Sequence, residues 1–525
     1  MKKLTLLTLC LLSLATNAQQ ILWEKSYGGD KVEYLFDAIP TADFGFILAG
    51  SSLSSQKGDV AHTNQGNYDY WLWKMDEHGD MVWQKSFGGD GHDLLKSIKH
   101  TKDGGFILAG TSNSNISGQK KAHSFGLEDL WVIKLNAAGV EDWQVTLGGR
   151  GQDYLSTIEQ TNDGGFIIGA TSNSDGIKEA LGKKETNKGG LDYWVIKLDQ
   201  KGKIDWQKNI GGNYEDQLTQ VITTSQGYLV AGYSNSDAIH DKKTTNNGET
   251  DYWVIMLDQT GKELWQRNYG QTGTNVLKSV LKTRDNHIIL AGEHTPAPED
   301  IKHSNTADFQ LIKIDFNGDM IWEQTHKTVA INQLTNLIEN QDGTLLISGY
   351  GLEQNTVSPY AKQKKANEGE NDYILIKLTA EGNEIWQKII GSNGQDQLSK
   401  AIETRDGGYL LTGTSDGKAS RDKRSHSQAK DFWLVKLQDP DKPLVEKPKM
   451  EAFPNPTARY TNVIVGFEFE EATVTIADLA GRIIHQRTTN DRTVPIDLGN
   501  QPEGIYIVEV RSKQDKGSVK ILKEK

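Results

Sequence analysis

Seven polar side chains, each ten residues after a tryptophan, are the residues of this sequence best suited to bind a metal ion. Carboxylate and amide oxygens are the ligands that calcium prefers, so seven copies could form a cation-binding ring. The interpretation that we favour is that each side chain accepts backbone N–H groups of the glycine-rich turn beside it. We therefore expect no bound metal. The seven residues are Glu33, Asp93, Asp153, Asp216, Asn275, Asn332 and Asp396.

A second group of candidate residues is basic and lies in long polar loops. If all these loops leave one face of the molecule, an acidic protein carries a basic crown there. Such a crown could bind a polyanion, for example an acidic glycan, lipopolysaccharide or DNA. The alternative is that the residues only keep long loops solvated, and both interpretations stay open. The basic residues are Lys57, Lys120, Lys121, Lys183, Lys184, Lys242, Lys243, Lys302, Lys364, Lys365, Lys423 and Arg424.

No other pattern in the sequence indicates catalysis. The motifs G-x-S-x-G and H-E-x-x-H are missing, and the 12 histidines are scattered without metal-ligand spacing. The segments 199–206 and 258–265 are similar to the tryptophan-docking repeats of quinoprotein dehydrogenases, which implies pyrroloquinoline quinone. Those enzymes resemble eight-bladed rings with a vicinal cysteine pair, and this chain has one cysteine, so we expect no cofactor.

The middle of the chain is one unit repeated seven times. Seven tryptophans are spaced 57 to 64 residues apart, and all 13 tryptophans lie in the repeats, where we expect them to pack between blades. A unit such as 93–147 contains four short apolar runs joined by turns: 93–101, 105–112, 129–135 and 141–147. Four strands with a period of about 60 predict a β-propeller blade. The spaced tryptophans are Trp23, Trp83, Trp143, Trp206, Trp265, Trp322 and Trp386.

The two ends of the repeat region predict how the ring closes. Residues 21–27 form a fourth strand with no first three strands before it, whereas 396–437 supply three strands without a fourth. The N-terminal strand should complete the seventh blade and leave no open sheet edge. The sequence therefore predicts a seven-bladed β-propeller over 21–438, with the seven polar residues around the mouth of its central channel. A right-handed solenoid is the alternative.

Composition excludes several classes of protein. The chain has 525 residues, 58 basic and 70 acidic, with a net charge of −12, which argues against a surface that coats nucleic acid. A single cysteine rules out an intrachain disulfide and a thiolate metal cage. No run of eighteen apolar residues occurs, so we expect no membrane span.

The first residues predict export. Lys2 and Lys3 precede an apolar run over 4–14 and small residues up to Ala18, the parts of a secretory signal peptide over 1–18. We expect cleavage after Ala18.

After the propeller, five prolines between 439 and 456 indicate a stiff linker over 439–452. Short alternating runs follow, which predict a small β-sandwich over 453–525. The segments 453–457, 476–482 and 504–508 resemble the type A C-terminal sorting domain of the type IX secretion system, with Phe453 where that family often has tyrosine. An ordinary accessory sandwich is the alternative. The resemblance implies a Bacteroidetes-type exported protein whose tail is bound by an outer-membrane translocon, then usually removed. The sorting signal would include Pro454, Asn455, Pro456, Gly481, Gly504 and Tyr506.

Taken together, these patterns predict an all-β protein that is secreted or held at the outer cell surface, without enzymatic activity. We expect a monomer that acts as a binding or adhesion module, with an anionic polysaccharide or a surface protein as its ligand. The alternative is an extracellular glycan-active enzyme, a lyase or hydrolase, with its site in the top-face loops.

Overall fold

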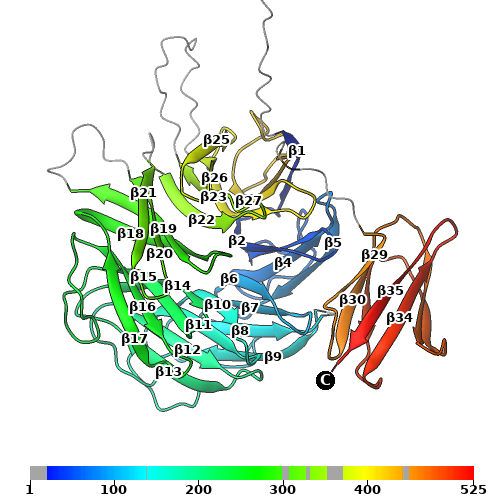
Figure 1. Cartoon of the computed structure of the whole chain (residues 1–525), viewed down its shortest axis with the longest axis horizontal. Helices are drawn as coiled ribbons and strands as arrows, with labels where there is room; N and C mark the ends of the chain where they lie inside the picture. Colours follow the sequence, from blue (N-terminus) through cyan, green and yellow to red (C-terminus); the bar gives the residue numbers. More distant parts are fainter. Residues whose placement is uncertain are drawn as a thin grey trace, which may run out of the picture.

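The computed structural model contains seven four-stranded antiparallel sheets and a separate pair of smaller sheets (Figure 1). It describes residues 20–137, 139–297, 307–326, 332–351, 371–439, 442 and 448–524. The expected signal peptide, half of the linker, Lys302, Lys364 and Lys365 lie outside these residues.

Each of the seven sheets is one blade, and its strands follow one another in sequence except in the last. The first strands are β2 (Glu33–Pro40), β6 (Asp93–His100), β10 (Asp153–Gln160), β14 (Asp216–Thr223), β18 (Gly273–Lys282), β22 (Asn332–Glu339) and β26 (Asp396–Glu403). The second strands are β3 (Phe46–Ser52), β7 (Phe106–Ser112), β11 (Phe166–Ser172), β15 (Tyr228–Ser234), β19 (Ile288–Pro296), β23 (Leu345–Gly351) and β27 (Tyr409–Ser415). The third strands are β4 (Asp69–Met75), β8 (Asp129–Leu135), β12 (Asp192–Leu198), β16 (Asp251–Leu257), β20 (Asp308–Ile314), β24 (Asp372–Leu378) and β28 (Asp431–Leu437). The fourth strands are β5 (Met81–Phe87), β9 (Glu141–Leu147), β13 (Ile204–Ile210), β17 (Glu263–Tyr269), β21 (Met320–His326), β25 (Glu384–Ile390) and β1 (Ile21–Tyr27).

The first strands contact one another in a closed cycle, from β2 through β6, β10, β14, β18 and β22 to β26 and back to β2. They therefore surround the central axis, and the predicted seven-bladed β-propeller is confirmed. The fourth strand of each blade lies at the outer rim.

The ring closes through its N-terminal strand, as predicted. β1 pairs with β28, with Trp23 opposite Lys436 and Tyr27 opposite Phe432. Glu24 on β1 accepts hydrogen bonds from the backbone N–H of Arg424 and Ser425 and from the Trp433 indole, at 2.9 to 3.0 Å. The last blade is therefore assembled from both ends of the ring sequence.

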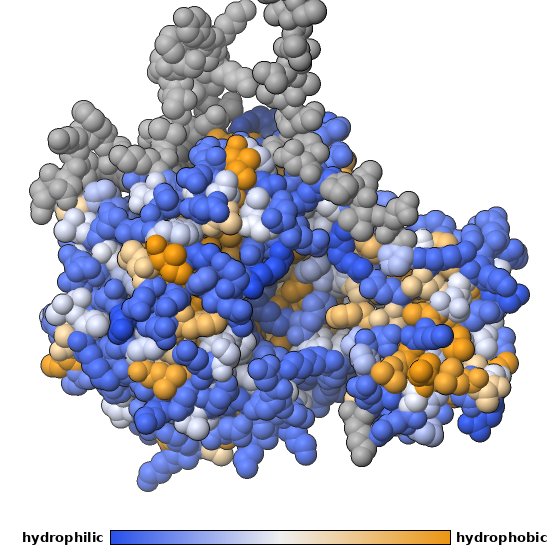
Figure 2. Space-filling model, viewed as in Figure 1, coloured by the Kyte–Doolittle hydropathy of each residue, from blue (hydrophilic) through white to orange (hydrophobic). Residues whose placement is uncertain are grey.

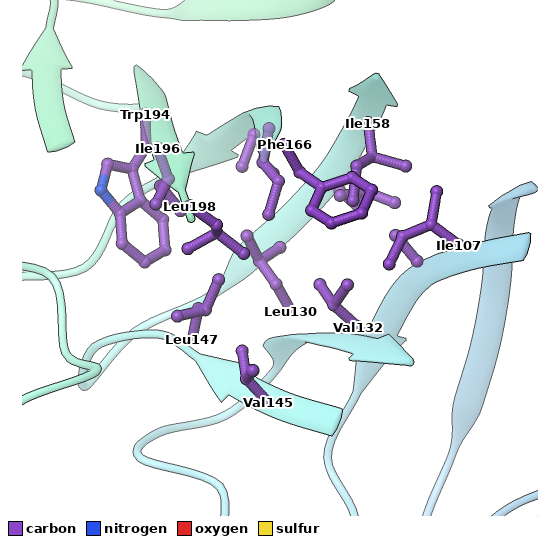
Figure 3. Close-up of a cluster of buried hydrophobic side chains, with 14 residues drawn as sticks. Ile107, Leu130, Val132, Val145, Leu147, Ile158, Phe166, Trp194, Ile196 and Leu198 are labelled. Carbon is purple, nitrogen blue, oxygen red and sulfur yellow. The ribbon is translucent and has the colours of Figure 1, made fainter. Parts of the chain in front are cut away.

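The hydrophobic cores lie between blades. Figure 3 shows one of them, in which Leu130 and Val132 of one blade face Phe166, Trp194 and Ile196 of the next, all buried. Each blade face is apolar because its strands are rich in branched and aromatic residues, and burial of these side chains stabilises the ring. Trp71, Trp131, Trp194, Trp253 and Trp433 are fully buried, as the packing interpretation requires.

The C-terminal sandwich consists of a three-stranded and a four-stranded sheet around one core. The three-stranded sheet contains β29 (Met450–Phe453), β30 (Tyr460–Val465) and β33 (Thr493–Asp497). The four-stranded sheet contains β32 (Ile483–Thr489), β31 (Ala472–Asp478), β34 (Gly504–Arg511) and β35 (Lys516–Lys523). The strand β29 was not predicted, and it begins before the expected domain boundary at 453. Its short sequence lies in the proline-rich stretch, so only its pairing with β30 identifies it as a strand.

The sandwich lies beside the last, first and second blades of the ring. Thr493 donates to Asp43 at 2.6 Å, and Arg405 forms an ion pair with Glu451 at 2.8 Å. A cleft of about 680 Å³ remains between the two parts, with Trp83 and Phe453 in its lining. Among the described residues, no helix is long and apolar enough to cross a bilayer.

Candidate functional site

Six of the seven polar residues after the tryptophans cap turns, and the side chain of the seventh, Asn332, lies outside the described residues. Asp93 accepts the backbone N–H of Gly89 at 2.7 Å and the hydroxyl of Ser114 at 2.8 Å. Asp153 and Asp216 make the same bonds in their blades. The turn-capping interpretation is confirmed for these residues. The Asp93, Asp153 and Asp216 side chains are buried, so they do not present a solvent-exposed polar ring. In the part of the chain that the structure describes, no group of three or more acidic, histidine or cysteine side chains is placed to hold a metal ion.

The same acids form buried pairs between blades. Asp69, Asp129 and Asp192 at the starts of third strands lie close to Asp93, Asp153 and Asp216 of the next blade. Among the described residues, none donates a hydrogen bond to the Oδ1 atoms of these six carboxyl groups. Burial, together with the neighbouring acid, raises the pKa of Asp69 and of Asp129 to about 7.

One junction between two blades shows that these unpartnered carboxyl oxygen atoms can be satisfied by a hydrogen-bond donor on the neighbouring blade. Between the fourth and fifth blades, Asn275 stands where four other blades have aspartate, and its Nδ2 donates to Asp251 Oδ1 at 3.1 Å. A proton on one carboxyl group would make the same bond in an Asp–Asp pair. A shared proton in each pair would thus supply the missing bond, in keeping with the raised pKa of these acids.

Four of the predicted surface lysines are buried, which corrects the expected basic crown. Lys120, Lys183, Lys242 and Lys423 are at most 1% exposed. Lys120 Nζ donates to Ser112 Oγ at 3.0 Å and lies 5.6 Å from the centre of the Trp131 ring. Burial lowers the pKa of each of these four lysines to about 8. In the first blade Val60 occupies the position that corresponds to Lys120 and packs against Trp71. The role of this position is therefore packing.

A glutamine after the outer tryptophan fixes each lysine-bearing loop. Gln144 Oε1 accepts the backbone N–H of Lys121 at 3.0 Å and the indole N–H of Trp131 at 3.1 Å. Its Nε2 donates to the carbonyl of Gln119 at 2.8 Å. Gln84, Gln207 and Gln266 make equivalent bonds, and Glu24 replaces glutamine in the closing blade. The loops therefore lie along the outer strands and do not surround the central axis.

Of the predicted basic residues that the structure describes, the exposed ones are Lys57, Lys121, Lys184, Lys243 and Arg424. Two of them are neutralised by outer-strand acids: Lys121 pairs with Glu141 at 2.7 Å and Lys243 with Glu263 at 2.8 Å. Exposed ion pairs of this kind contribute little to stability and leave little free charge for a polyanion.

The burial of one lysine of each pair makes a prediction for stability. Lys120→Ala should lower the free energy of unfolding by about 2–4 kcal/mol, because it leaves a cavity over Trp131. The matched change Lys121→Ala, in an exposed side chain, should shift it by no more than about 0.5 kcal/mol. Lys120→Val should recover part of the loss, since Val60 fills this place in the first blade. Urea unfolding of the three variants measures the difference, and equal midpoints for the two alanine variants would show that Lys120 is a solvated loop residue.

Side chains that differ from blade to blade lie around the central axis, at the end of the ring where the first strands begin. On β2, Tyr34 and Phe36 are half-buried and alternate with buried residues. The Tyr34 ring lies 5.6 Å from that of Tyr68, and Lys430 lies 5.2 Å above Tyr34. Lys96 on the next first strand lies 3.6 Å above the Phe36 ring. The places of Tyr34 and Phe36 are taken in the third blade by Tyr154 and Ser156, and in the fourth by Gln217 and Thr219.

The remaining blades place further tyrosines and amides in this region. Tyr233 donates to Gln217 at 2.7 Å and Tyr350 to Gln333 at 2.8 Å. Lys430 donates to Gln397 at 2.5 Å. Burial lowers the pKa of Lys96 to about 8, while Glu128 raises it. We call these residues the axial group: Tyr34, Phe36, Tyr68, Lys96, Tyr154, Gln217, Tyr233, Gln333, Tyr350, Gln397 and Lys430. Sequence analysis missed them because they do not follow the repeat, and that departure is the signal that could have identified them.

Comparison with known proteins assigns the C-terminal sandwich to a family. Residues 451–524 match the model of the secretion system C-terminal sorting domain. The regulatory protein FlaEY of Caulobacter vibrioides is 22% identical over 239 residues, which are 44% of this chain and 24% of that protein. This chain thus matches about a quarter of the length of that relative.

Solved structures with a similar arrangement have low sequence identity. The Pan2 WD40 domain of Neurospora crassa is 13% identical with a TM-score of 0.41, covering 82% of this chain and 98% of that one. Hydrazine synthase of Kuenenia stuttgartiensis is 11% identical with a TM-score of 0.39, covering 77% and 95%. PorZ, a surface component of the type IX secretion system of Porphyromonas gingivalis, is 9% identical with a TM-score of 0.21, covering 94% and 81%. The fold assignment depends on the strand pairing described above. Residues 451–524 are a sorting domain of the type IX secretion system, and the chain is a secreted seven-bladed β-propeller protein that carries this domain after its ring.

Proposed function

We propose that this protein is a non-catalytic binding module, outside the cell or on its surface, whose axial group contacts a glycan. The observation that carries the proposal is the contrast between repeated and non-repeated positions. The repeated acids cap turns, four of the loop lysines are buried, and the glutamines hold loops. The side chains that vary between blades are half-exposed and gather around the axis.

The chemistry of the axial group favours a polar ligand of low net charge. Tyrosine offers a flat apolar face and a hydroxyl at low conformational cost, and it is enriched in binding surfaces. The amides of Gln217, Gln333 and Gln397 can exchange their present hydrogen bonds for bonds to sugar hydroxyls. Nearby charges balance, because Lys278 pairs with Glu293 at 3.5 Å and Lys96 lies close to Glu128. A strongly anionic polymer would find little unpaired positive charge here.

The exported chain should be tested on an array of neutral and acidic glycans, with mass spectrometry of the bound glycans to detect cleavage. We expect binding without cleavage, and a weak dependence on salt because few ions are released. Tyr34→Ala combined with Tyr154→Ala should weaken binding at least about tenfold, since one buried aromatic contact contributes about 1–2 kcal/mol or more.

The matched control replaces three exposed loop residues, Lys121, Lys184 and Lys243, by glutamine. It should bind within about twofold of the parent chain. Melting temperatures of both variants confirm that the ring is folded. If the loop variant loses binding and the tyrosine variant does not, the ligand contacts the outer loops and is anionic. Glycan cleavage by the parent chain would favour the enzymatic alternative.

A further inference from the structure

The sorting domain carries an exposed apolar patch. Leu479, Ile483, Ile505 and Leu522 are 63%, 58%, 38% and 36% exposed. The apolar surface on the C-terminal sandwich is visible in Figure 2, where most of the visible ring surface is hydrophilic.

Strand pairing brings these residues together on the outer face of the four-stranded sheet. Ile505 on β34 lies opposite Leu522 on β35, and Ile507 lies opposite Ala477 on β31. Ala477 is in turn opposite Ile483 on β32. Paired residues of neighbouring strands point to the same face, so one apolar cluster spans four strands. We call Ala477, Leu479, Ile483, Ile505, Ile507 and Leu522 the apolar patch.

The fold itself does not require this patch. Residues alternating with it, such as Ile476, Tyr506 and Val508, are buried and form the core. Farther along the same outer face the paired positions are polar, with Thr475 opposite Glu509 and Thr473 opposite Arg511. A solvated sheet face is expected to be polar throughout, so the apolar end indicates a contact with another molecule.

The position of the patch identifies its partner. It lies within residues 451–524, and four of its six members belong to the segments 476–482 and 504–508, while Ile483 directly follows the first segment and Leu522 is on the C-terminal strand. The ring contacts the other sheet, through Thr493 and Glu451. The sheet with the patch therefore remains available to the secretion apparatus while the domain is attached to its cargo.

We infer that the apolar patch is the surface by which a protein component of the type IX secretion apparatus binds this sorting domain. The contact would be largely dry and apolar at its centre, with Arg482 and Lys520 at its polar rim, as in specific protein interfaces. This inference rests on the sorting domain alone and does not depend on the proposed glycan binding.

The test uses the full chain expressed in a host with an active type IX system. Replacing Leu479, Ile483, Ile505 and Leu522 by serine should reduce the exported fraction at least about tenfold, with the chain retained inside the outer membrane. The matched control replaces Leu264, Ile321 and Ile385, which are 49%, 48% and 46% exposed on the outer rim of the ring, by serine. This control should be exported like the parent.

Thermal unfolding of the purified variants separates recognition from folding. All four substituted residues of the patch are exposed, so we expect an unchanged melting temperature. Should the fourfold variant be destabilised, Leu479→Ser, in a turn, replaces it and should still lower export. Normal export of a folded patch variant would overturn the inference. Binding of the parent, but not of the patch variant, to phospholipid vesicles would also overturn it, by assigning the patch to a membrane. Glycan binding by the ring should be unchanged in every variant.

Discussion

A chain that lacks residues 20–27 should lose several kcal/mol of unfolding free energy and aggregate. The deletion removes Trp23 and Tyr27 from the core between the last and first blades. Truncation of one buried aromatic side chain alone costs about 3–5 kcal/mol. It also leaves β28 as an exposed apolar edge, which is a template for association with other chains. Thermal unfolding and light scattering of the deleted and parent chains measure the two effects.

Substitutions within β1 provide the controls for this deletion. Glu24→Ala should cost about 1–3 kcal/mol, because the Trp433 indole and two backbone N–H groups lose their acceptor. Glu24→Gln should be nearly neutral, since glutamine has this role in other blades. Leu22→Ala should also be nearly neutral, because Leu22 is 49% exposed. A deleted chain that melts with the parent would refute closure through β1.

The second large effect is a dependence of stability on pH that comes from the buried acid pairs. The folded pKa of Asp69 and of Asp129 is about 7 and that of Asp216 is about 6, whereas unfolded aspartate titrates at about 3.9. A raised folded pKa means that the folded state retains a proton that the unfolded state has lost. This contribution is fully present below about pH 4 and is lost as the pH rises through 6 to 7.

The shift is about three pKa units for Asp69 and Asp129 and about two for Asp216, so each pair should account for at most about 2–4 kcal/mol, less where solvent screens the charge. The buried lysines act in a separate window. Their folded pKa of about 8 is below the unfolded value, so their contribution increases with pH only above 8. The decrease in stability between pH 4 and 7 therefore belongs to the acids.

Asn275 suggests the variant that tests this account. Asp93→Asn, Asp153→Asn and Asp216→Asn together should keep the hydrogen bond between each pair and remove its proton. The decrease of the unfolding free energy between pH 4 and 8, measured in urea, should then be smaller than in the parent, and the variant should be more stable than the parent at pH 8; the remaining slope belongs to acids such as Asp396, whose pKa is about 6. Adding calcium or a chelator should change neither protein. Stabilisation of the parent by calcium, lost in the variant, would show that the pairs hold a cation.

The fold could be predicted from the repeat because the same apolar runs, turns and spaced tryptophans recur in each of the seven units. The third and fourth strands of the second blade begin and end at the predicted residues 129–135 and 141–147. The closure was predictable because strands were missing at opposite ends of the repeat. The strand β29 was not, since its pairing with β30 depends on contacts that no local pattern encodes.

Two sequence positions that change together from one blade to another also indicate that the residues at these positions are in contact. Lys134 on a third strand pairs with Asp103 in the turn after the first strand at 2.8 Å, and five other blades have equivalent pairs. The fourth blade has Gln226 in the turn and Met256 on the strand, so both partners change together. Such a joint change indicates that the two positions touch.

The burial of Lys120 and its equivalents could not be predicted from their position in long polar loops. A loop rich in lysine, serine and asparagine is ordinarily solvated. Here the Gln144 side chain holds the loop against the outer strand by a hydrogen bond, and the Lys120 side chain covers the Trp131 ring. The axial group was missed for the opposite reason, since its members depart from the repeat on which the prediction was built.

The most direct test of the account is a hydrogen–deuterium exchange comparison of the exported chain with and without the glycan that binds it best. The account predicts slower exchange in the tops of the first strands, such as 33–36, 93–96 and 153–156, and around 68 and 430. It predicts no change in the outer loops 115–125, 178–188 and 238–248. Protection confined to those loops, with the first strands unchanged, would contradict it.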